Sequence, residues 1–366
     1  MDLIDRLPNC PFTTADAAAR AVTKQQVASL VRSGELRRPF RGAYVPAGLI
    51  DSSETRAATL RLVVNPTAVV CDRLAAWVWG IDVLEVGELD VPPPIDAFVL
   101  RGEGRIRRAD CRSGERDLND DEIVVTGGLR VTTPVRTAID LACLLPPRKG
   151  LAALDAFMRA HGLTHDDLRL CLRRFHRRRG VVQARQLVGF ADPEAESPGE
   201  SWVRYEILVR ALPKPSLQQW VYFGGRPLFR LDLAYPHLKI AVEYDGREFH
   251  EGKDNEDADE ERRTWLRRHG WTVIVVTKDD FTPEAISGWI SDLRAALGDR
   301  ADSGPGRRTG GRSADSTRPG ADSTRPGADS TRPGANSTRP GANSTRPGAN
   351  STVSAGARPR GGPGPG

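Results

Sequence analysis

The sequence predicts a multidomain protein of the α/β (α+β) class, followed by a tail that does not fold. The chain has 366 residues, of which 39% are hydrophobic, enough for two or three domains with cores of their own. Segments with the helical period of 3.6 and segments with the period of two are both present, which predicts helices together with strands. We therefore expect domains at 1–50, 55–190 and 196–297 and a tail at 299–366.

The tail is predicted to be disordered because a polar repeat cannot bury enough apolar surface to offset its ordering entropy. Five complete copies of a heptapeptide lie between Ala314 and Gly348. Residues 299–366 carry 11 Arg and 5 Asp, a net charge of +6, whereas the whole chain carries +5. The basic excess therefore lies outside the folded part, and it is weak support for a nucleic-acid partner.

Cysteine spacing and hydropathy predict a cytoplasmic protein that does not associate with membranes. The five cysteines are far apart, without the paired spacing of a zinc site or a dense disulfide framework. The N-terminus lacks a basic segment followed by an apolar core, and no run approaches 18 apolar residues.

The first domain is predicted to be a winged helix-turn-helix. Thr13 or Thr14 can cap a first short helix, and Thr23 can cap a second one over 24–32. An arginine-rich hairpin follows the turn at Gly34. In this fold the second helix enters the major groove of DNA, and the hairpin contacts phosphates.

We expect the first domain to bind DNA. The candidates for contact with base edges are Lys24, Gln25 and Gln26, and those for contact with phosphates are Arg37, Arg38 and Arg41. The alternative is a helical pair that contacts a protein, with its arginines solvated. The segments Gly34–Leu36 and Arg41–Tyr44 resemble the turn and the closing motif of type IV antitoxins of the abortive-infection class. The resemblance implies DNA as a partner.

Residues 55–190 are predicted to form an α+β domain without a catalytic set. A helix is expected over 67–80, and Gly127-Gly128 is expected to turn a hairpin between two short strands. Antitoxin-like proteins often carry a domain of this kind after the winged helix. The run from Arg173 to Arg179 is either a solvated helix end or a ridge that contacts phosphates beside the next domain.

Three carboxylates are predicted to converge in the domain at 196–297, whose expected element order is α-β-β-β-α-β-α. Alternation along its third strand places Glu243 and Asp245 on one face, and a hairpin with the preceding strand brings Asp232 level with 241–243. Carboxylates so close repel one another unless a cation neutralises them, and oxygen ligands favour Mg²⁺ or Mn²⁺. We expect Asp232 and Glu243 to bind this metal.

These carboxylates carry a resemblance to a bacterial domain family of unknown function that is related to the very-short-patch repair endonucleases. The segments that match its PD-(D/E)XK pattern are Asp232–Pro236, Glu243–His250, Asp259–Leu266 and Gly270–Val273. The resemblance implies a restriction-endonuclease-like fold with Asp232, Glu243 and Asp245 at the catalytic site. It also implies that His250 lies beside the scissile phosphate and that Glu200 on the leading helix completes the site.

One position departs from the pattern of these nucleases. Asp245 stands where most of them have a lysine that orients the attacking water. Lys278, after the next strand, is a candidate to replace that lysine in space.

Two functions follow from these sites. The first is a metal-dependent DNA endonuclease, directed by the winged helix and acting in DNA repair or in defence. The alternative is a non-catalytic, antitoxin-like transcriptional regulator, which Asp245 in the lysine position favours. An adaptor that uses the middle domain and the tail is a third hypothesis. The sequence does not identify a partner protein, whether a toxin or a repair protein.

Overall fold

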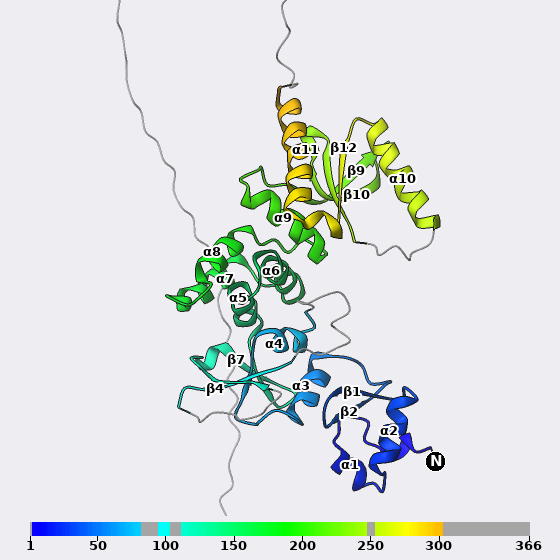
Figure 1. The fold of residues 1–366 in the computed structure, drawn as a ribbon, viewed down its shortest axis with the longest axis vertical. Coiled ribbons are helices and arrows are strands. Elements are labelled where there is room, and N and C mark those ends of the chain that lie inside the picture. Colours follow the sequence, from blue (N-terminus) through cyan, green and yellow to red (C-terminus); the bar gives the residue numbers. More distant parts are fainter. Residues whose placement is uncertain (1, 82–93, 103–110, 247–252, 303–366) are drawn as a thin grey trace, which may run out of the picture. The chain divides into compact units, whose positions relative to one another are not determined.

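The protein is a mixed α/β chain in which helices and sheets form successive groups (Figure 1). The computed structural model describes residues 2–81, 94–102, 111–246 and 253–302. Within these residues the strands form three sheets, of two, four and six strands. The predicted disordered tail lies almost wholly outside the described residues, as does His250.

Two short helices and a hairpin make up the N-terminal part. The elements are α1 (Thr14–Ala18), α2 (Lys24–Arg32), β1 (Leu36–Phe40) and β2 (Ala43–Pro46), after a 3-10 turn at Ile4–Arg6. Thr13 and Thr23 each cap a helix through the side-chain oxygen, in a reciprocal capping box with the residue three positions later. The chain turns after α2 at Gly34, whose φ of +80° is left-handed. Phe12, Val27 and Leu30 belong to the buried core beneath.

A six-stranded mixed sheet opens the middle part. Its strands are β3 (Val69–Val70), β4 (Ile95–Leu100), β5 (Cys111–Arg112), β6 (Glu115–Arg116), β7 (Ile123–Thr126) and β8 (Leu129–Thr132). The hairpin turn predicted at Gly127-Gly128 is confirmed between β7 and β8. A Cβ on Gly127 would lie 2.7 Å from the backbone oxygen of Glu54, so only glycine fits there.

The helix expected over 67–80 begins later than predicted. Val69 and Val70 form β3, which pairs with β4 and β8, and the helix α4 covers only Asp72–Val78. The prediction was wrong at this end because two buried β-branched residues pack well on a sheet, and the neighbouring strands come from distant parts of the sequence. Helix α3 (Ser53–Arg61) precedes β3.

Four helices form the second core of the middle part. They are α5 (Pro134–Leu144), α6 (Pro147–His161), α7 (His165–Leu172) and α8 (Val181–Phe190), with a 3-10 helix η3 (Arg173–Phe175) between the last two. Ile139, Leu154, Phe157 and Leu187 are fully buried among them. Burial of this many large apolar side chains is the main source of stability for such a helical group.

The last part has the element order α-β-β-β-α-β-α that the sequence predicts. The elements are α9 (Pro198–Val209), β9 (Ser216–Phe223), β10 (Arg226–Tyr235), β11 (Ile240–Asp245), α10 (Lys253–Arg268), β12 (Thr272–Thr277) and α11 (Pro283–Asp302). The strand order is β12-β11-β10-β9, with β11 and β12 parallel and the other pairs antiparallel. Helices α9 and α11 cover one face and α10 the other (Figure 1), through Ile207 and Leu293 on one side and Leu266 on the other.

A buried ion pair joins α9 to α6. Arg204 of α9 is fully buried and pairs with Asp155 of α6. The same carboxylate accepts a hydrogen bond from Ser201 Oγ at 2.7 Å and one from the Asp192 backbone N–H at 2.8 Å. Because a buried charge is stable only when it is neutralised and hydrogen-bonded, Arg204 and Ser201 link α9 to α6, and the Asp192 N–H, from the segment before α9, satisfies the same carboxylate.

Candidate functional site

The second helix of the N-terminal part presents one polar face to solvent. Val27 and Leu30 are buried, whereas the exposed residues are Lys24, Gln25, Ala28, Ser29 and Arg32. Gln25, Ser29 and Arg32 are separated by four and three positions, so they share one stripe of the helix. Ser29 and Arg32 were not among the candidates predicted for contact with base edges. Their helical spacing from Gln25 places them on the same face and could have added them.

Gln26 has a structural role in the helix start. Its side-chain oxygen accepts from the backbone N–H of Thr23 at 2.8 Å and from Thr23 Oγ1 at 3.1 Å. The structure therefore places Gln26 in the capping box, half-buried, and not on the exposed stripe with Gln25.

The three hairpin arginines have different surroundings. Arg37 donates through Nη2 to the backbone oxygen of Leu49 at 3.0 Å, and its Nε is buried. The Arg38 guanidinium is exposed and lies 5.9 Å from the centre of the Tyr44 ring. Arg41 is exposed at the turn between the two strands. Arg38 and Arg41 are therefore available to an anionic partner, whereas Arg37 fastens the chain that follows the hairpin.

Strand register brings Asp232 and Glu243 to the same level of the last sheet. Leu233 pairs with Val242 across β10 and β11, and the two carboxylates come next along each strand. Asp232 accepts from the backbone N–H of Tyr244 at 3.1 Å. Burial raises the pKa of Asp232, and the Tyr244 hydrogen bond opposes this effect.

Arginines from α10 neutralise the two carboxylates of β11. Arg262 Nη2 lies 2.9 Å from Glu243 Oε2, and Arg263 Nη2 lies 2.8 Å from Asp245 Oδ2. Arg263 Nε also lies 3.6 Å from Glu243 Oε2. The helix pair expected between Asp259 and Arg262 is present as well, at 3.7 Å. The ion pairs between α10 and β11 join residues 18 and 19 positions apart, so no local sequence pattern predicts them.

Glu200 and Lys278 complete the residues predicted for this site. Glu200 is buried and accepts from the Glu196 backbone N–H at 2.9 Å and from Gln218 Nε2 at 2.8 Å. Burial raises the pKa of Glu200. Lys278 follows Thr277, the residue that pairs with Asp245 across β11 and β12.

Among the described residues, arginines and hydrogen-bond donors occupy some of the oxygens that a divalent cation would need at this place. One Glu243 oxygen and one Asp245 oxygen are ion-paired with arginine, and both donors to Glu200 engage the same oxygen. Glu243 Oε1 is buried without a hydrogen-bond partner in the described part of the chain. Within those residues, no group of three Asp, Glu, His or Cys side chains could hold a metal ion.

Comparisons with known proteins find relatives that are similar to this chain over most of its length. An uncharacterized protein in each of two strains of Mycobacterium tuberculosis is 31% identical to it over 271 residues, which cover 72% of this chain and 93% of the relative. The chain belongs to the family of these mycobacterial proteins.

Two antitoxin models also match parts of the chain. Residues 11–47 match the family described as a transcriptional regulator, AbiEi antitoxin. Residues 68–190 match the AbiEi antitoxin C-terminal domain. The N-terminal and middle parts are thus similar to AbiEi antitoxins, which agrees with the antitoxin resemblance predicted for the first domain.

These matches correct the leading functional prediction. A metal-dependent endonuclease was expected, but both matching domains belong to antitoxin regulators, so the alternative, an antitoxin-like regulator, is the better supported function. The error came from treating a cluster of carboxylates as free ligands when arginines of α10 neutralise two of them. Across the described residues, no helix combines the length and the apolarity that a bilayer crossing needs.

Proposed function

We propose that the protein is a DNA-binding transcriptional regulator of the antitoxin type, in which residues 1–50 form a winged helix. The observation that carries this proposal is the exposed polar stripe of α2, in the segment that matches the AbiEi transcriptional regulators. A winged helix presents such a face to the major groove.

The stripe has the side chains that base recognition needs. Gln25 can donate and accept toward an adenine edge, and Arg32 can donate two parallel hydrogen bonds to guanine. Ala28 and Ser29 between them are small, which allows the helix backbone to come close to the bases. Lys24, at the first turn, is placed to contact a phosphate or a base edge beside the groove.

The hairpin supplies charge without sequence selectivity. Arg38 and Arg41 are exposed, so each can neutralise one phosphate, whereas Arg37 holds the Leu49 backbone and acts on DNA only through the position of the hairpin. Contacts to phosphates fix the orientation of the protein on the duplex.

The role we infer for residues 196–297 is that of a non-catalytic module. Their element order supports a fold shared with the repair endonucleases, and so does the strand register that places Asp232 opposite Glu243. The ion pairs of Arg262 and Arg263 support the loss of a metal-dependent reaction.

The middle part is the place we infer for a protein partner. Residues 68–190 match the AbiEi antitoxin C-terminal domain, and a toxin is the partner that we infer from this match. Binding of a co-expressed toxin to a chain that lacks residues 1–50 would support this role. If this shortened chain lost toxin binding as well as DNA binding, the partner would be assigned to the N-terminal part.

A binding assay with the full chain tests the DNA proposal. The probe is the duplex upstream of the protein's own gene, with a scrambled duplex as competitor. Gln25→Ala and Arg32→Ala are each expected to weaken specific binding by about 1–3 kcal/mol, the value of a lost base contact. Arg169→Ala is the matched control, because Arg169 is exposed on α7 and pairs only with exposed Asp166 in the described part of the chain.

Two results would overturn the proposal. One is equal binding of the upstream and scrambled duplexes, and the other is the same weakening by Arg169→Ala as by Arg32→Ala. The DNA is also expected to stay intact in Mg²⁺ and in Mn²⁺, so cleavage that disappears in Asp232→Ala would restore the nuclease hypothesis.

A further inference from the structure

A group of exposed aromatic side chains lies on β9, at the edge of the last sheet. Trp220 is 45% exposed, Tyr222 61% and Phe223 59%, and no other Phe, Tyr or Trp in the described part of the chain is exposed to this degree. The other large apolar side chains that are exposed there are isoleucine, leucine and valine. Exposed apolar groups that gather in one place mark a surface for a partner.

Trp220 and Tyr222 share one face of β9, because side chains two positions apart along a strand point the same way. Their Cα atoms are about 6.5 Å apart, close to twice the rise of about 3.4 Å between stacked bases. Two rings at this separation can therefore take two bases of one nucleic-acid strand. Every base has a flat face, so stacking of this kind tolerates any base sequence.

Arginines of β10 lie across from this strand. The strand register places Arg230 opposite Trp220 and, at the end of the hairpin, Arg226 opposite Phe223. Arg226 is exposed and has no ion-pair partner among the described residues. Arg230 lies 2.6 Å from Glu196, but the two side chains are 43% and 46% exposed, so water screens this pair. A phosphate can therefore compete with Glu196 for the guanidinium.

The opposite face of the hairpin is fixed against α10. Val221 is buried there, and Phe229 packs against the same core. The centre of the Phe223 ring lies 5.6 Å from the centres of the Trp265 and His269 rings, which it meets edge to face. The two exposed rings of the other face are therefore carried by a hairpin that is already held in position, which reduces the entropy lost on binding.

We propose that this face of the β9–β10 hairpin binds single-stranded nucleic acid, with bases stacked on Trp220 and Tyr222 and the backbone near Arg230. A duplex does not offer this contact, because its bases are already stacked on one another. Residues 207–231 contain four basic residues and no acidic one, so the hairpin attracts a polyanion and repels a second copy of itself. Rings beside guanidinium groups suit this ligand better than a membrane, which takes up a continuous apolar face.

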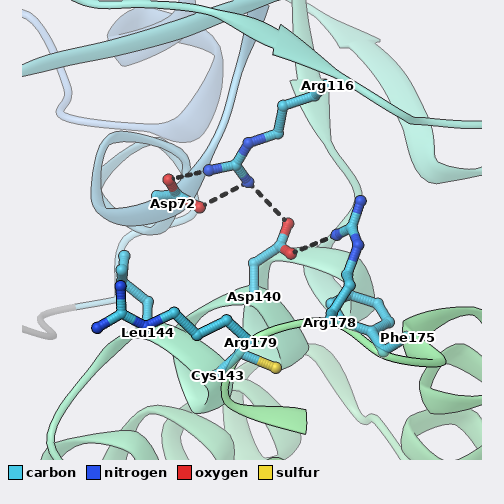
Figure 2. A pocket seen from close by; sticks show the side chains of 8 residues that line it. All are labelled: Asp72, Arg116, Asp140, Cys143, Leu144, Phe175, Arg178 and Arg179. Atoms are coloured by element: carbon cyan, nitrogen blue, oxygen red, sulfur yellow. Dashed lines mark hydrogen bonds and ion pairs between the residues drawn. The ribbon is translucent and has the colours of Figure 1, made fainter.

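The basic run at 173–179 is less suited to this ligand. Arg178 lies 3.5 Å from Asp140, toward which it is directed in a cavity of about 370 Å³ in the middle part (Figure 2). Phe175 is buried. The run therefore offers exposed arginines for phosphates without an exposed Phe, Tyr or Trp for a base.

Fluorescence anisotropy on the full chain, at constant ionic strength, tests this inference. The probes are labelled strands of equal length: oligo(dT), oligo(U) and a strand of abasic sites, which has the phosphates without the bases. We expect oligo(dT) and oligo(U) to bind, and the tighter of the two identifies DNA or RNA as the natural strand. The abasic strand is expected to bind at least about tenfold more weakly, since two stacked bases are lost.

Substitutions of Trp220 separate stacking from apolar contact. Trp220→Leu keeps an apolar side chain without the ring and is expected to weaken oligo(dT) binding about fivefold or more, whereas the matched control Trp220→Phe keeps a ring and most of the affinity. Tyr222→Leu, at a more exposed residue, is expected to act like Trp220→Leu. Because both positions are exposed, the variants are expected to unfold at the temperature of the parent protein.

Equal affinity for oligo(dT) and the abasic strand, or equal weakening by Trp220→Leu and Trp220→Phe, would overturn the inference. So would self-association, or binding to phosphatidylserine vesicles, that Trp220→Leu abolishes while oligo(dT) binding is unchanged. Binding of the upstream duplex by α2 uses a different surface and is expected to be the same in Trp220→Leu and the parent protein, so the two proposals fail separately.

Discussion

Replacing Arg262 by Gln tests whether arginine neutralises the carboxylate site. Glu243 is buried, and its strongest partner among the described residues is Arg262 Nη2 at 2.9 Å. After the substitution the carboxylate keeps only the longer contact to Arg263 Nε at 3.6 Å, and Arg263 is already shared with Asp245. Breaking a buried pair by removing one partner costs about 3–5 kcal/mol, since the other charge stays buried.

The lower end of that range applies here. The Arg262 side chain is 24% exposed, so water screens part of the interaction and can enter when the side chain is shortened. We expect a loss of about 3 kcal/mol. Hydrogen exchange measured by mass spectrometry on peptides that cover 240–246 reports the local loss of stability. We expect the rate of amide exchange in these peptides to increase about 100-fold.

Arg267→Gln is the matched control on the same helix. Arg267 pairs with exposed Glu260 at 2.8 Å, and such surface pairs contribute about 1 kcal/mol or less. Adding Glu243→Gln to the Arg262 variant should recover much of the stability, because the buried Glu243 charge that lost its partner is then removed as well. An effect of Arg262→Gln no larger than that of Arg267→Gln would refute the view that arginine holds this carboxylate in place.

Three other predictions concern the N-terminal and middle parts. Arg41→Gln should weaken binding equally to specific and scrambled DNA and reduce the slope of log affinity against log salt by about 0.9, the value for one phosphate contact. Hydrogen bonds from the Thr13 backbone and hydroxyl lower the pKa of Asp16, so its contribution to stability is present above the ordinary pKa and is lost as the pH falls through the lowered one. NMR titration should show this lowered pKa, and Thr13→Ala should bring it back toward the ordinary value. Gly180→Ala should destabilise the protein by more than about 1 kcal/mol in urea unfolding, because the new Cβ would overlap the Cys143 carbonyl, and an unchanged midpoint would contradict the close packing of that segment on α5.

Local signals in the sequence were sufficient for the order of elements and for helix starts. Thr23 precedes the polar first turn of α2 and caps it, and the Gly127-Gly128 pair marks a hairpin turn. Period-two alternation and the Pro236 turn were enough to place Asp232 level with 241–243, and the structure narrows this to Glu243.

The partners of the charged side chains were decided only by the tertiary structure. Glu243 meets Arg262 and Arg178 meets Asp140 because separate helices pack against a sheet or against each other, and such contacts join residues 19 and 38 positions apart. Sequence spacing shows which carboxylates share a face, but it does not show which cations lie opposite that face. Two of the carboxylates that suggest a metal site in the sequence, Glu243 and Asp245, are therefore ion-paired in the folded chain, because a buried charge is stable only with a partner. Phe175, Arg178 and Arg179 of the basic run line a cavity of the middle part.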